Sequence, residues 1–365
     1  MKVPIVDLKN VVPKKTIESV EEVIKSGYWV DGPQVKKLEE DFANFCGVQY
    51  CRALCNGTAA LMTLMASLDL ASGDEVIVPS FTFIATANSV KFTDAKPVFA
   101  DVSEDTFTID PESIKNKITP HTKAIMPVHL FGLCANMKAI KEICEDHDIK
   151  LIEDAAQAHG AKINDKRSGS FGYGAGFSLY PTKNMFAGGE GGLITTNDEE
   201  LFKKVNLIMN HGQSKKYYHT RLGYNFRLAE INGVLARYSL NKIEEWNEKR
   251  RENAEYLTKK LDNVDQIELP TIPNGYRHVY HQYTIKVKAS LRQKVINALE
   301  HNDIGYGIHY AIPIHQQPYY KDLGYDKINL PITERLAEEV LSLPIHPLLE
   351  KIQLDFVAKT IKNCF

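Results

Sequence analysis

Residues 150–196 read KLIEDAAQAHGAKINDKRSGSFGYGAGFSLYPTKNMFAGGEGGLITT, and this stretch decides the fold. It contains three short apolar runs, at 150–154, 176–180 and 192–195, each of which is predicted to be a buried strand. Charged, polar and glycine-rich residues collect where these strands end. Open α/β sheets bind their ligands at the carboxyl ends of the strands, so the stretch predicts both a sheet and a site.

The same alternation of apolar runs and helical periodicity extends on both sides of this stretch, from about residue 15 to residue 210. Strand followed by helix, repeated, is typical of a mostly parallel sheet with helices on its faces. The further strands are predicted at 50–54, 75–78, 96–99 and 124–129, with helices at 58–70 and 137–147.

The C-terminal third has a different pattern. Residues 228–262 keep helical spacing, with a break expected near Gly233, and would connect to a small α+β domain. That domain is predicted to contain strands at 280–287 and 305–310 and helices at 291–301 and 354–362. We therefore expect a large domain, which would hold the site, over residues 11–245 and a small domain over residues 246–365, with residues 1–10 packed against the small one.

Composition excludes several classes of protein. The 365 residues include 44 Lys and Arg against 46 Asp and Glu, a net charge of −2, which gives no basic surface for nucleic acid or an anionic membrane. The chain has no run of 18 apolar residues and no signal-peptide core at its start, so we expect a cytoplasmic protein. Six cysteines without a CxxC pair predict neither a zinc site nor disulfides, and no other metal is expected.

Asn56, Gly57 and Thr58 follow a predicted strand and open a predicted helix. The backbone N–H groups at a helix N-terminus, together with the hydroxyl of Thr58, favour an anion such as phosphate. Simple capping of the helix by Asn56 or Thr58 would explain the same residues. The motif alone leaves both interpretations open.

Asp154 and Lys183 are the two charged residues that suggest chemistry. Asp154 ends a buried strand, where a carboxylate could bind a metal, act as a base, pair with a protonated heterocycle or simply cap a helix. Lys183 lies between two buried strands, where partial desolvation would lower the pKa of its amine, as a Schiff-base lysine requires, although a lysine in a turn is more often solvated. The glycine-rich loop that follows lacks the GK[ST] ending of a P-loop.

Together, Asp154 and Lys183 form a chemical pair suited to pyridoxal phosphate. The lysine would bind the cofactor covalently, and the aspartate would keep the pyridine nitrogen protonated. The hydroxyls of Thr58 and Ser178 would hold the phosphate. An aromatic ring should stack on the cofactor, and the spacing does not choose between Phe81 and Phe83.

With these motifs in order, the chain resembles the DegT/DnrJ/StrS family of sugar-nucleotide aminotransferases along nearly its whole length. The matching stretches are SGYWVDGPQVKKLEEDFANFCG, NGTAAL, VPSFTFIATANSV, PVHLFG, IEDAAQAHGA, FSLYPTKNMFAGGEGG, GYNFRLAEINGVLA and HYAIPIHQQPYY. The resemblance implies fold type I of the pyridoxal phosphate enzymes, with a seven-stranded, mostly parallel sheet in the large domain.

The resemblance also assigns roles to residues. Lys183 would be the Schiff-base lysine and general base, Asp154 the partner of the pyridinium nitrogen, and Phe83 the stacking ring. Gln157 would hydrogen-bond to the phenolic oxygen of the cofactor. The phosphate would be held by Gly57, Thr58 and Ser178, and by Asn225 from the neighbouring subunit of a homodimer with shared active sites.

In this family L-glutamate usually donates the amino group and leaves as 2-oxoglutarate, and a keto sugar attached to a nucleoside diphosphate accepts it. The segment YYHTRLGYNFR (217–227) is more similar to members that aminate carbon 4 of the sugar, so a 4-keto-6-deoxy acceptor is expected, for amino-sugar and surface-polysaccharide biosynthesis. The segments that line the sugar-nucleotide site in relatives contain Tyr28, Trp29, Glu190, His309, Tyr310 and His315.

Three alternatives stay open from the sequence. One is amination of a 3-keto sugar. Another is a cysteine desulfurase or lyase, which would share Lys183 and Asp154 but would need a mobile nucleophilic cysteine, for which only Cys364 near the C-terminus qualifies. The third is a non-catalytic regulator, disfavoured because the chain keeps Lys183 and has no additional DNA-binding module.

Overall fold

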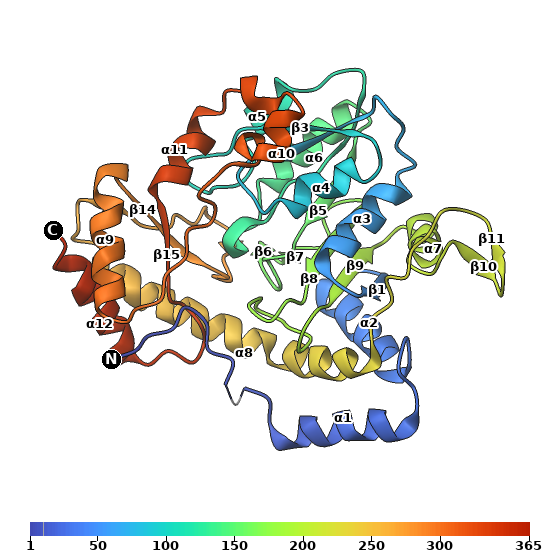
Figure 1. Cartoon of the computed structure of the whole chain (residues 1–365), viewed down its shortest axis with the longest axis horizontal. Coiled ribbons are helices and arrows are strands. Elements are labelled where there is room, and N and C mark those ends of the chain that lie inside the picture. The colour runs from blue at the N-terminus through green and yellow to red at the C-terminus, as the bar shows by residue number, and fades with distance from the viewer. Residues whose placement is uncertain (10) are drawn as a thin grey trace.

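The computed structural model describes residues 1–9 and 11–365 and is built around a seven-stranded sheet (Figure 1). In spatial order the strands are β1 (Tyr50–Leu54), β9 (Gly192–Thr196), β8 (Gly174–Ser178), β5 (Lys150–Asp154), β4 (Thr122–Ile125), β2 (Glu75–Pro79) and β3 (Lys96–Ala100). Strands β8, β5, β4, β2 and β3 are parallel, whereas β9 is antiparallel to both of its neighbours. The predicted mostly parallel sheet is confirmed.

Helices cover both faces of this sheet, which explains why its central strands are apolar throughout. In β5, Leu151 packs in a hydrophobic cluster with α6, and the next residue, Ile152, packs in another with α3, α4 and α7. The helices of this part are α1 (Lys14–Ser26), α2 (Pro33–Cys46), α3 (Gly57–Ser67), α4 (Ala85–Lys91), α5 (Pro111–Lys115), α6 (Met137–Asp146) and α7 (Glu199–Ile208).

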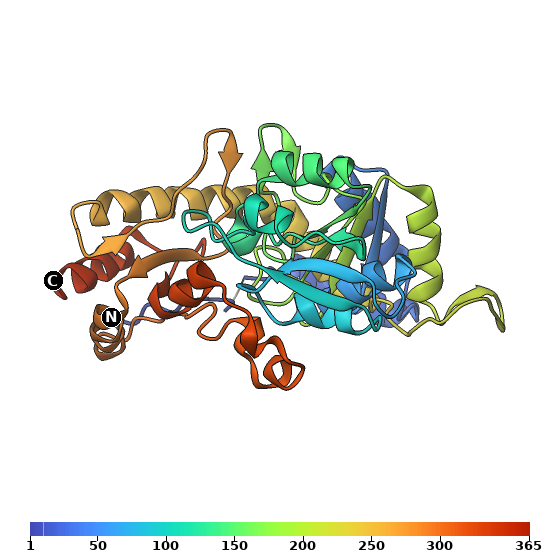
Figure 2. The ribbon, with the colours of Figure 1, turned by 90° about the horizontal axis from the view of Figure 1, so that it is seen from above.

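The C-terminal part packs beside the large sheet around a core of its own, which also takes in Val3 from the N-terminus (Figures 1 and 2). A three-stranded sheet, in the order β12 (Ile267–Glu268), β14 (Tyr283–Val287) and β15 (Val340–Leu343), forms its centre. Helices α9 (Ala289–His301) and α12 (Lys351–Lys362) pack in this core. Helix α10 (Pro318–Asp322) instead packs on the core of the large sheet, and α11 (Pro331–Glu339) packs in a separate cluster that contains Phe81.

Two smaller sheets complete the fold. Strands β6 (Lys162–Ile163), β7 (Lys166–Arg167) and β13 (Tyr276–Arg277) pair beside the middle of α8 (Glu230–Leu261). The hairpin of β10 (Gln213–Lys215) and β11 (Tyr218–His219) projects away from the body of the molecule (Figure 2). Short 3-10 turns occur at Leu130–Gly132, Ile314–Gln316 and Tyr325–Lys327.

Helix α8 corrects one expectation, because it continues through Gly233 without a break for 32 residues. A β-carbon at Gly233 would lie 3.0 Å from the backbone and side chain of Val35 in α2. The glycine therefore allows two helices to approach closely rather than ending one of them. The helix contributes Ile243 to the core of the large sheet and Leu257 to the C-terminal core.

Two predicted strands are wrong in detail. Residues 305–310 form only one isolated bridge, between Gly307 and Ser342, and the true second strand is β15. Strand β4 ends at Ile125 rather than 129, two residues before Pro127, which has no N–H to donate to the ladder. The division between residues 245 and 246 stays a prediction, and Asn10 of the expected N-terminal segment lies outside the described residues.

Within residues 1–9 and 11–365, no helix has both the length and the hydrophobicity needed to cross a membrane.

Candidate active site

A cavity of about 930 Å³ lies where the parallel strands end. It is walled by residues that follow β2, β5 and β8, by the first turn of α3, and by residues 281, 282, 309 and 310 of the C-terminal part. The structure brings most of the expected residues to this one cavity. They are Gly57, Thr58, Phe83, Asp154, Gln157, Ser178, Lys183, Glu190, His309 and Tyr310.

The first turn of α3 forms an anion cradle. Asn56 caps the helix by accepting a 2.7 Å hydrogen bond from the N–H of Ala59, so the capping hypothesis holds for Asn56. Gly57 allows the end of β8 to come close, because a β-carbon at this position would lie 2.6 Å from the β-carbon of Ser178. The helix N-terminus and the hydroxyls of Thr58 and Ser178 therefore face the same space, an arrangement that suits a phosphate.

Asp154 is buried and its carboxylate is held in place. The hydroxyl of Thr86 donates to Oδ2 at 2.8 Å, and the N–H of Ala156 donates to Oδ1 at 3.2 Å. Burial raises the pKa of this carboxyl, while these two donors and the charge of Lys183 oppose that rise. Thr86 comes from α4, and no motif in the sequence singled it out.

Lys183 lies in the turn after β8, where its N–H donates to the carbonyl of Tyr180 at 2.9 Å. Burial lowers the pKa of its amine to about 8, against an opposing effect of the Asp154 charge. Far more of the amine is therefore neutral near physiological pH than in an ordinary lysine, which favours a nucleophilic or proton-transferring role.

Phe83 lines the cavity, whereas Phe81 is fully buried in a separate cluster, so of the two rings it is Phe83 that a group in the cavity could meet. The ring of Phe83 lies 6.2 Å from that of Tyr310. Gln157 accepts a 2.8 Å hydrogen bond from the N–H of Phe131 and donates one of 3.0 Å to the hydroxyl of Tyr310. The amide orientation of Gln157 is thereby set, with its nitrogen directed to the Tyr310 side.

Some expected residues lie elsewhere. His315 is buried, with Nδ1 2.7 Å from the hydroxyl of Ser80 and Nε2 3.3 Å from Glu334, and it does not line the cavity. The other expected residues that do not line it are exposed on the surface: Tyr28, Trp29 and Asn225. Conversely, sequence reasoning missed His281, Gln282 and Tyr224, which do line it.

The cysteines do not support a desulfurase. Among the residues that the structure describes, none of the six free cysteines lines the cavity. Cys364 is buried in the C-terminal core, its thiol 3.3 Å from the carbonyl of Thr360, and burial raises its pKa. The described residues also contain no group of three or more His, Cys, Asp or Glu side chains placed to hold a metal ion.

The donor set fits pyridoxal phosphate. A buried carboxylate can hold the proton on a pyridine nitrogen, a neutral amine can react with an aldehyde, and a helix N-terminus with two hydroxyls can bind a phosphate. The fold and these residues define a pyridoxal phosphate-dependent aminotransferase of fold type I.

Comparison with known proteins also indicates an aminotransferase. The chain is 40% identical to a "Pleiotropic regulatory protein" of Geobacillus stearothermophilus, over 100% of this chain and 99% of that protein. It is also 40% identical to a UDP-N-acetyl-3-dehydro-alpha-D-glucosamine 3-aminotransferase of Acidithiobacillus ferrooxidans, over 99% and 97% of the two chains. Several other relatives are named dTDP-3-amino-sugar transaminases.

Among solved structures, the crystal structure of S. venezuelae DesV in complex with a ketimine intermediate matches with a TM-score of 0.96 and 35% identity, over 99% of this chain and 98% of that chain. The profile of the DegT/DnrJ/EryC1/StrS aminotransferase family matches residues 11–362, and the chain belongs to this family.

Proposed function

We propose that this aminotransferase transfers the amino group of L-glutamate to the 3-keto group of a hexose carried on a nucleoside diphosphate. The observation that carries the proposal is the pairing of a buried Asp154 with a Lys183 amine of lowered pKa in a cavity of about 930 Å³. The 40% identical Acidithiobacillus relative, named for amination at position 3, supports the ring position.

Carbon 4 is the second candidate. The segment 217–227 favours it on sequence grounds, and that segment includes β11 and the exposed residues near Asn225. The relatives whose names specify a 3-amino product weigh against it. In both candidates the keto carbon must reach the same position near Lys183, so the sugar ring and its nucleotide would be placed differently in the cavity. The two candidates therefore differ in which sugar reacts.

The residues that line the cavity would have different roles in amino-group transfer. Bound pyridoxal phosphate supplies an electron sink for the bond changes at the amino-bearing carbon. Asp154 would hold a proton on the heterocycle nitrogen, and Phe83, Gln157 and the cradle of α3 would hold the remainder of the group. Lys183 Nζ, with a pKa of about 8, would accept and return the proton that moves during transfer.

We also propose a homodimer with shared active sites. Lys183 is the only Lys or Arg lining the cavity among the described residues, yet a nucleoside-diphosphate sugar brings two further phosphates. Asn225 and Trp29 are exposed and do not line the cavity of their own chain, so a second copy would be able to use them. Glu190, His309 and Tyr310 are the residues of the same chain that would contact the sugar.

The test uses purified protein with pyridoxal phosphate, L-glutamate labelled with nitrogen-15, and matched 3-keto and 4-keto sugars on UDP, GDP and dTDP. Labelled amino sugar detected by mass spectrometry, together with stoichiometric 2-oxoglutarate, is the expected result with a 3-keto substrate. Transfer only to 4-keto sugars would assign carbon 4 instead. The absence of transfer to every sugar, or transfer that persists in Lys183→Ala, would overturn the proposal.

A further inference from the structure

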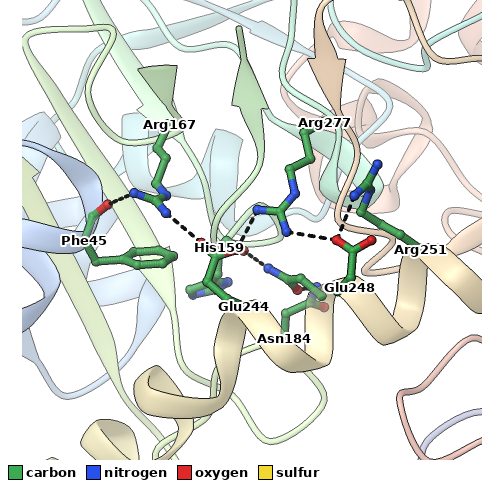
Figure 3. A network of polar contacts seen from close by, with 9 residues as sticks. Phe45, His159, Arg167, Asn184, Glu244, Glu248, Arg251 and Arg277 are labelled. Carbon is green, nitrogen blue, oxygen red and sulfur yellow. Dashed lines mark hydrogen bonds and ion pairs between the residues drawn. The ribbon is translucent and has the colours of Figure 1, made fainter. Parts of the chain in front are cut away.

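Two buried asparagines lie directly behind the reactive lysine. Asn184 follows Lys183 in sequence, and Asn247 lies in the middle of α8. The side-chain nitrogen of Asn184 donates to Oδ1 of Asn247 at 2.8 Å and to the carbonyl of Val279 at 2.9 Å. The side-chain nitrogen of Asn247 in turn donates to the carbonyl of His159 at 2.8 Å (Figure 3).

These hydrogen bonds connect the chain segments that build the cavity. The loop that ends at His159 begins just after Asp154 and carries Gln157. Val279 lies two residues before His281, which lines the cavity. The two amides thus link the Lys183 turn to the segments carrying Gln157 and His281, and attach all three to α8.

The contacts require two donors at position 184, whose side-chain oxygen has no hydrogen-bond partner among the described residues, and an amide at position 247. Asn184 uses both of its N–H groups on acceptors, so a side chain without donors would lose both bonds. Asn247 must accept from Asn184 and donate to His159, which only an amide of this length does here. Buried hydrogen bonds of this kind are costly to break, because the abandoned partners stay away from water.

A second layer of contacts lies outside the asparagines, nearer the surface (Figure 3). The carboxylate of Glu244 in α8 forms ion pairs with Arg167 from β7 and Arg277 from β13, each with a nitrogen–oxygen distance of 2.6 Å. Glu248 pairs with Arg251 at 2.7 Å and with Arg277 at 3.4 Å. These ion pairs are partly exposed, where such contacts contribute little, so the buried amides are the stronger constraint on the Lys183 turn.

We propose that Asn184 and Asn247 are positioning residues that fix the amine of Lys183 relative to Asp154 and the cofactor. The inference rests on the proposed role of Lys183. Neither asparagine contacts the substrate cavity, so their effect passes through the backbone of the turn. Loosening the turn would admit water to the amine and move it from its reactive position, and misplacement by about 1 Å costs up to about 100-fold in rate.

The test replaces Asn184 with leucine, which keeps the branched shape but removes both donors, and Asn247 with serine, a smaller change that serves if the first variant does not fold. Glu248→Gln, one residue from Asn247 on the same helix, is the matched control. In the full-length apoprotein, the pH dependence of Lys183 acylation is followed by peptide mass spectrometry. In the holoenzyme, kcat and KM are measured for both substrates.

In the wild type and Glu248→Gln, acylation of Lys183 should reach half its maximum near pH 8, whereas in Asn184→Leu the midpoint should move upward, toward the ordinary 10.5. The kcat of Asn184→Leu should fall about 10- to 100-fold while both KM values stay within about threefold. Asn247→Ser should show the same changes to a smaller degree, since one donor of Asn184 keeps its bond to Val279.

Folded asparagine variants that keep the wild-type midpoint and a kcat within about twofold would overturn the inference. This failure is distinct from a failure of the proposed function, which would appear as a wild type that transfers no amino group to any sugar, or as activity that survives in Lys183→Ala. A drop in thermal stability without a change in midpoint or kcat would make the asparagines merely structural, which also overturns it.

Discussion

The hydroxyl of Thr86 lies 2.8 Å from Oδ2 of Asp154 and donates to it, joining α4 to the end of β5. A buried carboxylate tends to become protonated because burial disfavours its charge. The Thr86 hydroxyl opposes this tendency, since it donates a hydrogen bond to the charged form. The charge state of Asp154 is therefore partly set by a residue from the connection between β2 and β3.

Thr86→Val, which keeps the shape and removes the donor, should raise the pKa of Asp154. We expect kcat to fall about 10-fold and its acidic limb to move to higher pH, since a hydrogen bond to a charged group contributes about 1.5–3 kcal/mol. The pH profile of kcat is the measurement. Thr63→Val is the control, because the buried hydroxyl of Thr63 has no hydrogen-bond partner among the described residues, and an equal shift in that variant would contradict the prediction.

Lys183 predicts a pH dependence for cofactor uptake. Its pKa is lowered to about 8, so the neutral amine dominates above pH 8 and the protonated amine below it. The rate at which apoprotein takes up pyridoxal phosphate should rise with pH through a midpoint near 8 and then level off. Stopped-flow absorbance measures this rate, and a midpoint near the ordinary lysine value of 10.5 would show that burial does not control the amine.

Gly57→Ala should damage the anion cradle. The added β-carbon would lie 2.6 Å from the β-carbon of Ser178, so α3 and the end of β8 must separate. We expect the dissociation constant for pyridoxal phosphate to rise by at least about 10-fold, roughly 1.4 kcal/mol. Gly324→Ala, at a positive φ but with open space around it, controls for general loss of stability and should leave cofactor affinity unchanged.

The shared active site is tested by mixing two inactive proteins. Lys183→Ala and Asn225→Ala are each expected to be strongly impaired as homodimers. If Asn225 acts in the neighbouring site, mixed dimers contain one site with both residues intact, and random exchange should restore about a quarter of wild-type sites. Activity after subunit exchange is the measurement. No recovery, with exchange verified by native mass spectrometry, would place Asn225 outside the partner's site.

Much of the large sheet and the Lys183–Asp154 pair could be predicted from sequence, because both depend on local signals. Buried strands in a parallel sheet are short apolar runs, and reactive residues follow their ends. The sequence does not show which of Phe81 and Phe83 lines the cavity. Both follow the same strand, and only the tertiary packing places Phe83 in the lining and Phe81 in a buried cluster.

Contacts between segments far apart in sequence were harder to predict. Tyr310 and His315 lie at the two ends of one short apolar and proline-containing segment. The side chain of His315 nevertheless contacts Ser80 and Glu334 instead of the cavity, and no local sequence pattern predicts these contacts. Strand β15 follows α11 directly, with no glycine or proline between them to mark a boundary. Thr86 and His281 reach the cavity only through tertiary packing.

Because α8 is unbroken, it connects the core of the large sheet rigidly to the C-terminal core. At 1.5 Å per residue its 32 residues span roughly 48 Å, and the stretch from Ile243, in the core of the large sheet, to Leu261, in the C-terminal core, spans roughly 27 Å. A tilt of about 5° at the large sheet would displace the far end by roughly 2.4 Å, a motion comparable to the diameter of a water molecule. His309, which lines the cavity, lies 3.1 Å from the hydroxyl of Ser342 in β15, so a change in the tilt of α8 would move this wall of the cavity relative to the large sheet.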